Sequence, residues 1–211
     1  HMKSPNLSSI APLAAGLLTL VLSSGCLSRS PEARTYVTSS SDGWRALAAR
    51  DEAACAFSIR VAPVDLAAYL DRPEIVTRAS GIEIQKSALQ RWGIPLDVAI
   101  DESVSLRLAQ ALPDAFVDVF SDVRRQPSDY LVNISVVRLD GYLGGEVELI
   151  AQWSVVRTGA GAKPVAQRVG RYAATAGAKS IEAYVQAVEK LLADLGDDIA
   201  AAVKADRAAK P

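Results

Sequence analysis

The sequence predicts a single α/β domain in which a mixed, largely antiparallel sheet packs against two main amphipathic helices. Two observations lead to this fold class. In several segments apolar and polar residues alternate, which is typical of strands with one buried face. In two other segments apolar residues recur every third or fourth position, which is typical of helices that cover a sheet. The chain of 211 residues is long enough for one domain with a sizeable core.

The first 25 residues predict a leader that is not part of this domain. We interpret His1-Met2 as a cloning scar. Lys3 then precedes an apolar run from Ile10 to Leu22. This run is shorter than the roughly 20 residues that a transmembrane helix needs. It has the length of the apolar region of a secretory signal peptide, and small residues follow it as they do at a cleavage site.

The end of the leader, Leu22-Ser23-Ser24-Gly25-Cys26, resembles the lipobox of bacterial lipoproteins. The resemblance implies that Cys26 carries covalent lipid, such as palmitate, and becomes the first residue of the mature chain. Leu27 stands where an Asp would favour retention in the inner membrane, so the resemblance implies the outer membrane. A plain signal peptide and a buried apolar segment with an accidental cysteine are the alternatives.

Composition and charge divide the rest of the chain and exclude some functions. Residues 26–34 are rich in Ser, Arg and Pro and predict a tether, 35–205 a periplasmic domain, and 206–211 a solvated tail. Lys3 is the only charged residue of the leader, so 22 basic and 24 acidic residues remain. This slightly negative balance argues against a nucleic-acid partner.

The sequence also lacks the residues of common catalytic and metal sites. Its only histidine is His1, so the natural chain has neither a Ser-His-Asp or Cys-His arrangement nor an imidazole ligand for zinc. Cys26 is assigned to lipid, which leaves Cys55 without a disulfide partner and predicts that it is a small buried residue. We therefore predict no enzyme activity, no metal and no cofactor other than the lipid on Cys26. A histidine-free enzyme is the remote alternative.

The first half of the domain predicts short strands and one helix. We expect a strand at 35–40, a loop or frayed turn at 41–54, and a strand at 57–64 that Pro63 ends. Pro73 separates this region from a hairpin of 75–78 with 81–85. A helix capped by Asp97 follows, with its stripe at Ile100, Val104, Leu108 and Leu112, and then a strand at 115–121.

The second half predicts a meander and a long helix. Apolar residues alternate from Tyr130 to Val136 and from Val147 to Val155, and a strand over 165–176 returns beside them. Asp140-Gly141 and Gly144-Gly145 supply the first turn. Ser180 caps the last helix, whose apolar stripe runs from Ile181 to Val203. Gly196 within it predicts a bend or early fraying.

Two segments of the domain resemble the PqiC-type family of auxiliary lipoproteins of MCE and ABC-type transport systems, which include paraquat-inducible systems. The family pattern is approximately P-V-x-L-x-x-Y-L-D-R-P-x-I-V-x-R, followed by R-W-x-x-P-L. Gly93 and Ile94 are a minor departure from it. The residues that match are Pro63, Val64, Leu66, Tyr69, Leu70, Asp71, Arg72, Pro73, Ile75, Val76, Arg78, Arg91, Trp92, Pro95 and Leu96.

The resemblance implies an outer-membrane lipoprotein, facing the periplasm, that serves as the accessory or docking subunit of an MCE-type system for intermembrane lipid transport. Its partners would be the MCE-domain subunit and, through the anchor, outer-membrane lipid, and we expect the domain to self-associate. An anchored regulator of a cell-wall synthase is the alternative. Candidate contact residues, each with a structural role as the alternative, are Tyr69, Leu70, Asp71, Arg72, Pro73 and Trp92.

Overall fold

The computed structural model describes residues 32–38, 44, 54–119, 128–159 and 161–209. The chain divides into two compact units, His1–Glu32 and Ala33–Pro211, and the helices and strands of the described residues belong to the second. Cys26, its lipobox and most of the loop predicted at 41–54 lie outside the described residues. The elements are β1 (Arg34–Tyr36), β2 (Phe57–Val61), β3 (Asp65–Leu66), β4 (Glu74–Arg78), β5 (Ile84–Trp92), α3 (Leu96–Ala111), β6 (Ala115–Asp118), β7 (Tyr130–Gly141), β8 (Glu146–Arg157), β9 (Lys163–Thr175) and α4 (Ile181–Ala208).

The sequence predicts a single sheet, but the strands form two, one of six strands and one of three. The large sheet has the order β6-β2-β7-β8-β9, with β3 paired to β7. Neighbours of β2 are parallel, whereas β7, β8 and β9 form the predicted antiparallel meander. The predicted α/β class with two main helices is confirmed. Alternation identifies a strand with one buried face, but it does not say which neighbour that strand joins.

The small sheet has the order β1-β5-β4 and contains the predicted hairpin. Its β5 strand runs to Trp92, well past the predicted end at residue 85, and pairs with β4 on one side and with β1 on the other. Most of β5 is exposed, and it therefore lacks the alternation by which the other strands are recognised. β1 ends at Tyr36. Val37 and Thr38 are not in a strand, and the other two residues of the strand expected at 35–40 lie outside the described part.

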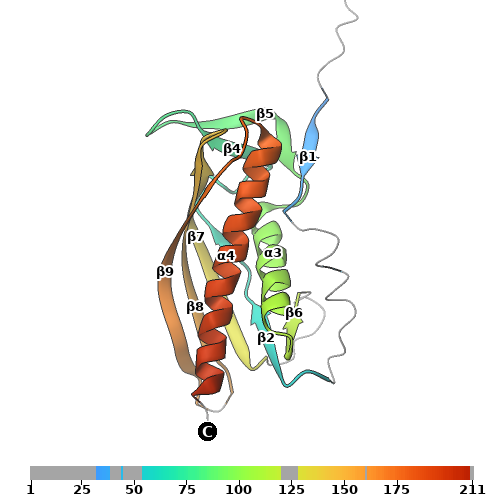
Figure 1. The fold of residues 1–211 in the computed structure, drawn as a ribbon, viewed down its shortest axis with the longest axis vertical. Helices are drawn as coiled ribbons and strands as arrows, with labels where there is room; N and C mark the ends of the chain where they lie inside the picture. The colour runs from blue at the N-terminus through green and yellow to red at the C-terminus, as the bar shows by residue number, and fades with distance from the viewer. Residues whose placement is uncertain (1–31, 39–43, 45–53, 120–127, 160, 210–211) are drawn as a thin grey trace, which may run out of the picture. The chain divides into compact units, whose positions relative to one another are not determined.

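Helices α3 and α4 lie side by side, with α4 packed on β8 and β9 and α3 on β2 and β6 (Figure 1). The predicted alternation is confirmed, because residues such as Ile59, Val132 and Leu149 are fully buried while their strand neighbours are more exposed. Ser180 caps α4 as predicted, since its Oγ accepts a hydrogen bond from the Ala183 amide. The core lies between the helices and this face of the large sheet.

Two local expectations are corrected. Pro95, not Asp97, occupies the N-cap position of α3, and no side-chain hydrogen bond caps that end. The fixed φ of proline suits a helix start, and Asp97 lies in the first turn, where its negative charge complements the helix dipole. Cys55 is partly buried rather than buried, because it lies just before β2 begins.

Helix α4 passes through Gly196 and continues to Ala208, so the predicted early fraying does not occur. A Cβ atom on Gly196 would lie 2.8 Å from Cβ and Cγ of Arg107 on α3. The glycine therefore allows the two helices to approach closely. Arg107 also donates hydrogen bonds from Nε and Nη2 to Asp197, at 2.9 and 2.7 Å, across the same contact.

We expect Gly196→Ala to lower the thermal midpoint of unfolding, by an amount equivalent to about 1–2 kcal/mol, because the new methyl group must displace the stem of Arg107. In an exposed helix the same change would instead stabilise by about 1 kcal/mol. The exposed Ala201 on the same helix provides the control, since Ala201→Gly should show only the propensity loss. A higher midpoint for Gly196→Ala would contradict the close approach of the helices.

The end of α4 differs from the solvated tail expected at 206–211, since residues 206–208 are helical. The carboxylate of Asp206 accepts hydrogen bonds from the Tyr130 hydroxyl at 2.8 Å and from Arg157 Nε at 3.0 Å. The guanidinium of Arg207 lies over the ring of Phe57, 3.8 Å from its centroid. These contacts fix the last turns of the helix to β2, β7 and β8.

Candidate functional site

The two segments that carry the family resemblance meet at one place on the domain. The backbone turns twice before β4, with hydrogen bonds from Leu70 N to Ala67 O and from Arg72 N to Leu70 O, each 2.8 Å long. The amide of Trp92, at the end of β5, donates to the carbonyl of Pro73 at 2.8 Å and joins the segments. The hollow between them measures about 350 Å³ and is lined by Asp71, Arg72, Pro73, Trp92, Gly93, Ile94, Pro95 and Leu96.

The six candidate contact residues divide into an interior and a surface group. Leu70 is 2% exposed and Trp92 is 7% exposed, so both belong to the core. This differs from the prediction that they supply contact area on the surface. The turn at Ala67–Leu70 directs Leu70 inward, where it lines a small internal space together with Trp92 and Tyr184. On the surface, Asp71 and Pro73 are exposed and Arg72 is partly exposed.

Arg72 is the residue of this site with an unused donor. Its Nε atom is buried and has no hydrogen-bond partner among the residues that the structure describes. A buried donor without a partner costs free energy, and such groups are rare in folded proteins. Because the atom is buried, an acceptor on a docking partner would reach it only after the partly exposed Arg72 side chain changes conformation on binding. Pro73 also biases the Arg72 backbone toward an extended conformation, which presents this side chain from a restricted position.

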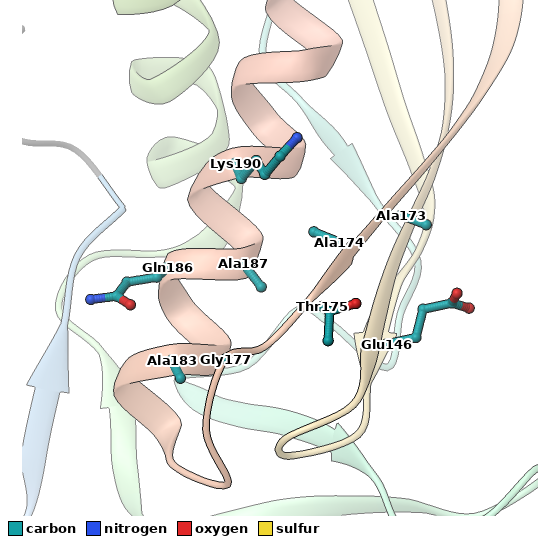
Figure 2. A pocket seen from close by; sticks show the side chains of 9 residues that line it. All are labelled: Glu146, Ala173, Ala174, Thr175, Gly177, Ala183, Gln186, Ala187 and Lys190. Atoms are coloured by element: carbon teal, nitrogen blue, oxygen red, sulfur yellow. The ribbon is translucent and has the colours of Figure 1, made fainter.

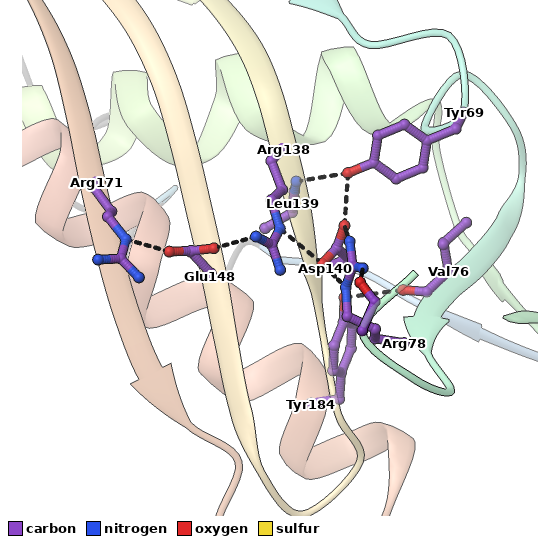
Figure 3. A network of polar contacts seen from close by, with 10 residues as sticks. Tyr69, Val76, Arg78, Arg138, Leu139, Asp140, Glu148, Arg171 and Tyr184 are labelled. Carbon is purple, nitrogen blue, oxygen red and sulfur yellow. Dashed lines mark hydrogen bonds and ion pairs between the residues drawn. The ribbon is translucent and has the colours of Figure 1, made fainter. Parts of the chain in front are cut away.

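Tyr69 belongs to a polar network that the sequence does not predict (Figure 3). Its hydroxyl donates to Asp140 Oδ2 at 2.9 Å and accepts a hydrogen bond from the Leu139 amide at 3.2 Å. Asp140 is 1% exposed. Arg78 donates to both of its carboxylate oxygens, from Nε at 2.7 Å and from Nη2 at 2.8 Å, and Arg138 Nε adds a bond of 3.0 Å. Tyr69 therefore has an internal role, and its hydroxyl is already engaged.

The network extends across the large sheet through Glu148 (Figure 3). Arg138 Nη1 forms an ion pair with Glu148 Oε2 at 2.6 Å, and Arg171 on β9 pairs with the other oxygen of the same carboxylate. The chain of charges thus joins β4 of the small sheet to β7, β8 and β9 of the large one. Each carboxylate is matched by arginines, so the network stabilises the packing of the sheets and offers no free acid or base.

The pKa values in the network agree with this structural role. Burial alone would raise the pKa of Asp140, but the hydrogen bonds from Arg78, Tyr69 and Arg138 hold it below its usual value. Burial raises the pKa of Tyr69 to about 12, and its hydrogen bond to Asp140 acts in the same direction. Asp140 is therefore a carboxylate, and Tyr69 a neutral hydroxyl donor, throughout the neutral range.

A second hollow, of about 500 Å³, lies between β9 and α4 (Figure 2). Small side chains make this space, because Ala174, Ala183 and Ala187 face it from the two elements. Glu146 and Lys190 lie at its borders, and Lys190 Nζ already pairs with Asp194 at 2.7 Å. The hollow brings together no set of side chains with recognisable chemistry. Within the described residues, no group of three potential metal ligands occurs.

The fold and this site define a class of protein. In the described part of the domain, the two family segments form a surface hollow beside Arg72, and the buried carboxylates of Asp140 and Glu148 are paired with arginines. Across the described part of the chain, no helix is long and apolar enough to cross a membrane. The class of protein is therefore a single mixed α/β domain with a surface hollow at its two family segments.

The family model for the ABC-type transport auxiliary lipoprotein component matches residues 42–200, and the chain belongs to this family. The resemblance of the segments at 61–78 and 91–100 is thereby confirmed. No curated protein matches the sequence.

Two solved structures share the fold. A crystal structure of an uncharacterized protein has a TM-score of 0.67 at 17% identity and covers 82% of this chain and 99% of its own. A protein of family DUF330 from Xanthomonas campestris has a TM-score of 0.61 at 18% identity and covers 86% of this chain and 97% of its own. At these identities the likeness extends to the fold alone.

Proposed function

We propose that this transport auxiliary lipoprotein is anchored in the outer membrane by lipid on Cys26 and serves as the docking subunit of an MCE-type system for intermembrane lipid transport. The family supports an auxiliary role in transport. The lipobox and Leu27 support the anchor and its membrane. The observation that carries the docking role is the buried Arg72 Nε without a partner among the described residues, at the hollow where both family motifs meet.

The docking surface consists of Asp71, Arg72 and Pro73, with the MCE-domain subunit as its partner. Pro73 restricts the backbone of the segment, so that binding orders fewer degrees of freedom. Arginine is favoured at protein interfaces because its guanidinium forms several hydrogen bonds and stacks on apolar surface. The hollow beside Arg72 provides such surface through Pro73, Ile94 and Pro95.

The proposal also includes self-association of the domain. A subunit that docks onto a symmetric ring of MCE-domain subunits is expected to form a matching oligomer. β9 supports this, because it is the outermost strand of the large sheet and is 13 residues long. One edge of such a strand has backbone groups that no neighbour in the same sheet pairs, and a second copy could use them.

The anchor is tested by Cys26→Ala in protein expressed with its natural start. The wild-type protein should fractionate with outer membranes and carry the mass of its acyl chains, because each buried CH₂ group contributes about 0.8 kcal/mol to membrane binding. Cys26→Ala should lose both properties, whereas Cys55→Ala should keep them. Unchanged localisation and mass in Cys26→Ala would show that the lipobox interpretation is wrong. In detergent extracts of the same membranes, the MCE-domain subunit should copurify with the wild-type protein.

A further inference from the structure

The turn between β4 and β5 places an isoleucine where polar residues are usual. Ile82 is 99% exposed and lies at the tip, between Gly81 and Glu83. Turn tips favour Gly, Asn, Asp, Ser and Pro, whose backbone or side chain suits the tight bend. Ile84, the first residue of β5, is two residues further along and is 38% exposed. The tip is therefore a small apolar projection.

This tip is held in place by the polar network. The amide of Ala79 donates to the carbonyl of Glu83 at 2.9 Å and closes the turn. Arg78 Nη1 donates to the carbonyl of Gly81 at 2.7 Å, while its other nitrogens bind Asp140 on β7. Figure 1 shows the hairpin projecting away from α3 and α4. Because the turn is braced against the large sheet, Ile82 is presented from a fixed position.

The chain between Cys26 and β1 is long enough to let the tip of the hairpin reach the membrane that holds the expected lipid anchor. β1 pairs with β5 in parallel, with Arg34 opposite Gln90, so the chain enters β1 from the side on which β5 begins. Seven residues lie between Cys26 and Arg34. They allow a separation of at most about 28 Å, at roughly 3.5 Å per residue. From Gln90 back to Ile84 the strand spans about 20 Å, at roughly 3.3 Å per residue.

We propose that the β4–β5 tip, through Ile82 and Ile84, contacts the lipid surface in which Cys26 is anchored. This inference rests on the proposed lipid anchor. The short tether keeps the small sheet close to the bilayer and so raises the effective concentration of the tip at the lipid surface. An apolar contact that would be too weak for a free domain can then persist. Glu83 and Lys86 beside the tip carry opposite charges, so the contact needs no anionic lipid.

Two-point contact would orient the domain. Pro73 and the tip lie at opposite ends of the β4–β5 hairpin, since β4 runs from Glu74 to Arg78 between them. With the tip against lipid, the docking surface at Asp71, Arg72 and Pro73 lies at the other end of the hairpin from the contact point. The hairpin would therefore set the direction in which the docking surface is presented to its partner.

The test uses the acylated full chain with Cys55 replaced by Ser, so that a cysteine introduced at position 82 is the only thiol to label, since acylation occupies that of Cys26. An environment-sensitive nitrobenzoxadiazole label is attached, and the protein is reconstituted in vesicles of phosphatidylethanolamine and phosphatidylglycerol. For Ile82→Cys we expect a blue-shifted emission and about twofold quenching by nitroxide lipids, because interfacial contacts lie roughly 5–10 Å into the headgroup boundary. Ala201→Cys, at an exposed position on α4, is the matched control and should show neither effect.

A label at Ile84→Cys should also shift, and adding Ile82→Asp should abolish that shift, which shows that the natural isoleucine and not the label makes the contact. Flotation of the vesicles reports the anchor separately. Protein that floats while the label at 82 remains unshifted overturns the tip contact alone. Protein that does not float overturns the anchor and the tip contact together.

Discussion

Replacing Asp140 by Asn is expected to lower the free energy of unfolding by about 3–5 kcal/mol, which is the usual effect of removing one partner of a buried ion pair. The carboxylate is 1% exposed, and the side chain of Arg78 that binds both of its oxygens is 14% exposed. Asn keeps the shape of the side chain but leaves this guanidinium without its counter-charge. It also offers one acceptor oxygen where Arg78, Arg138 and Tyr69 now share two.

The matched control is Asp197→Asn. Asp197 also accepts two hydrogen bonds from one guanidinium, that of Arg107, but the two side chains are 47% and 36% exposed. Exposed ion pairs contribute about 0–1 kcal/mol, so this variant should unfold nearly as the wild type does. Chemical denaturation of both variants measures the difference. Equal, small effects would show that the Asp140 network does not hold the small sheet to the large one.

The pH dependence of the Asp140 effect has a definite sign. The pKa of Asp140 is lowered in the folded protein, so the folded state holds the proton less tightly than the unfolded state does. Its stabilisation is fully present above the unfolded value of about 3.9 and is lost as the pH falls through the lower folded value. The difference in unfolding free energy between wild type and Asp140→Asn should therefore be constant near neutral pH and shrink in acid.

The parts of the fold that the sequence predicts are those set by local physical chemistry. Val132 and Leu149 lie on strands whose alternation follows from a buried and an exposed face, and both are fully buried as expected. Ser180 caps α4 because its own side chain accepts the amide hydrogen bond. The separation into two sheets could not be predicted in this way, since it depends on which strands pair across long stretches of chain. The role of Gly196 could not be predicted for the same reason, because Arg107 lies on another helix.

The candidate site was predicted in part. The motif identified the segment that holds Arg72, and the structure brings it beside the second motif through the hydrogen bond from Trp92 to Pro73. Sequence could not show that Leu70 and Trp92 face inward, because short apolar runs next to a proline have no periodicity. It treated Asp140 only as part of a turn, although its partner Arg78, 62 residues earlier, is the last residue of the motif. The burial of Asp140 could be predicted only from the position of Arg78 in the folded chain, because Arg78 supplies the counter-charge.

Replacing Arg72 by Glu is expected to weaken binding of the MCE-domain subunit by on the order of 2 kcal/mol or more, which is about 30-fold or more in Kd. The substitution removes the donor at the hollow and puts a negative charge beside Asp71. The thermal midpoint of the isolated domain should hardly change, because Arg72 Nε has no acceptor to lose among the described residues. Binding is measured by titration of the purified partner, and the midpoint by calorimetry on the same preparation. Light scattering of the same samples reports self-association.

Arg91→Glu is the control for this substitution. Arg91 belongs to the second motif and its side chain is 52% exposed, with a 4.0 Å ion pair to Glu74. The same reversal of charge there should leave binding within a few-fold of wild type, because exposed charges at the edge of a contact contribute little to affinity. Arg72→Lys separates charge from geometry, since lysine keeps the charge but has no Nε–H fork. A lower midpoint with unchanged binding in Arg72→Glu would make the segment from Tyr69 to Pro73 a fold element only. Loss of binding at an unchanged midpoint, with Arg91→Glu intact, would instead assign the docking contact to Arg72, because nothing else about the domain would have changed.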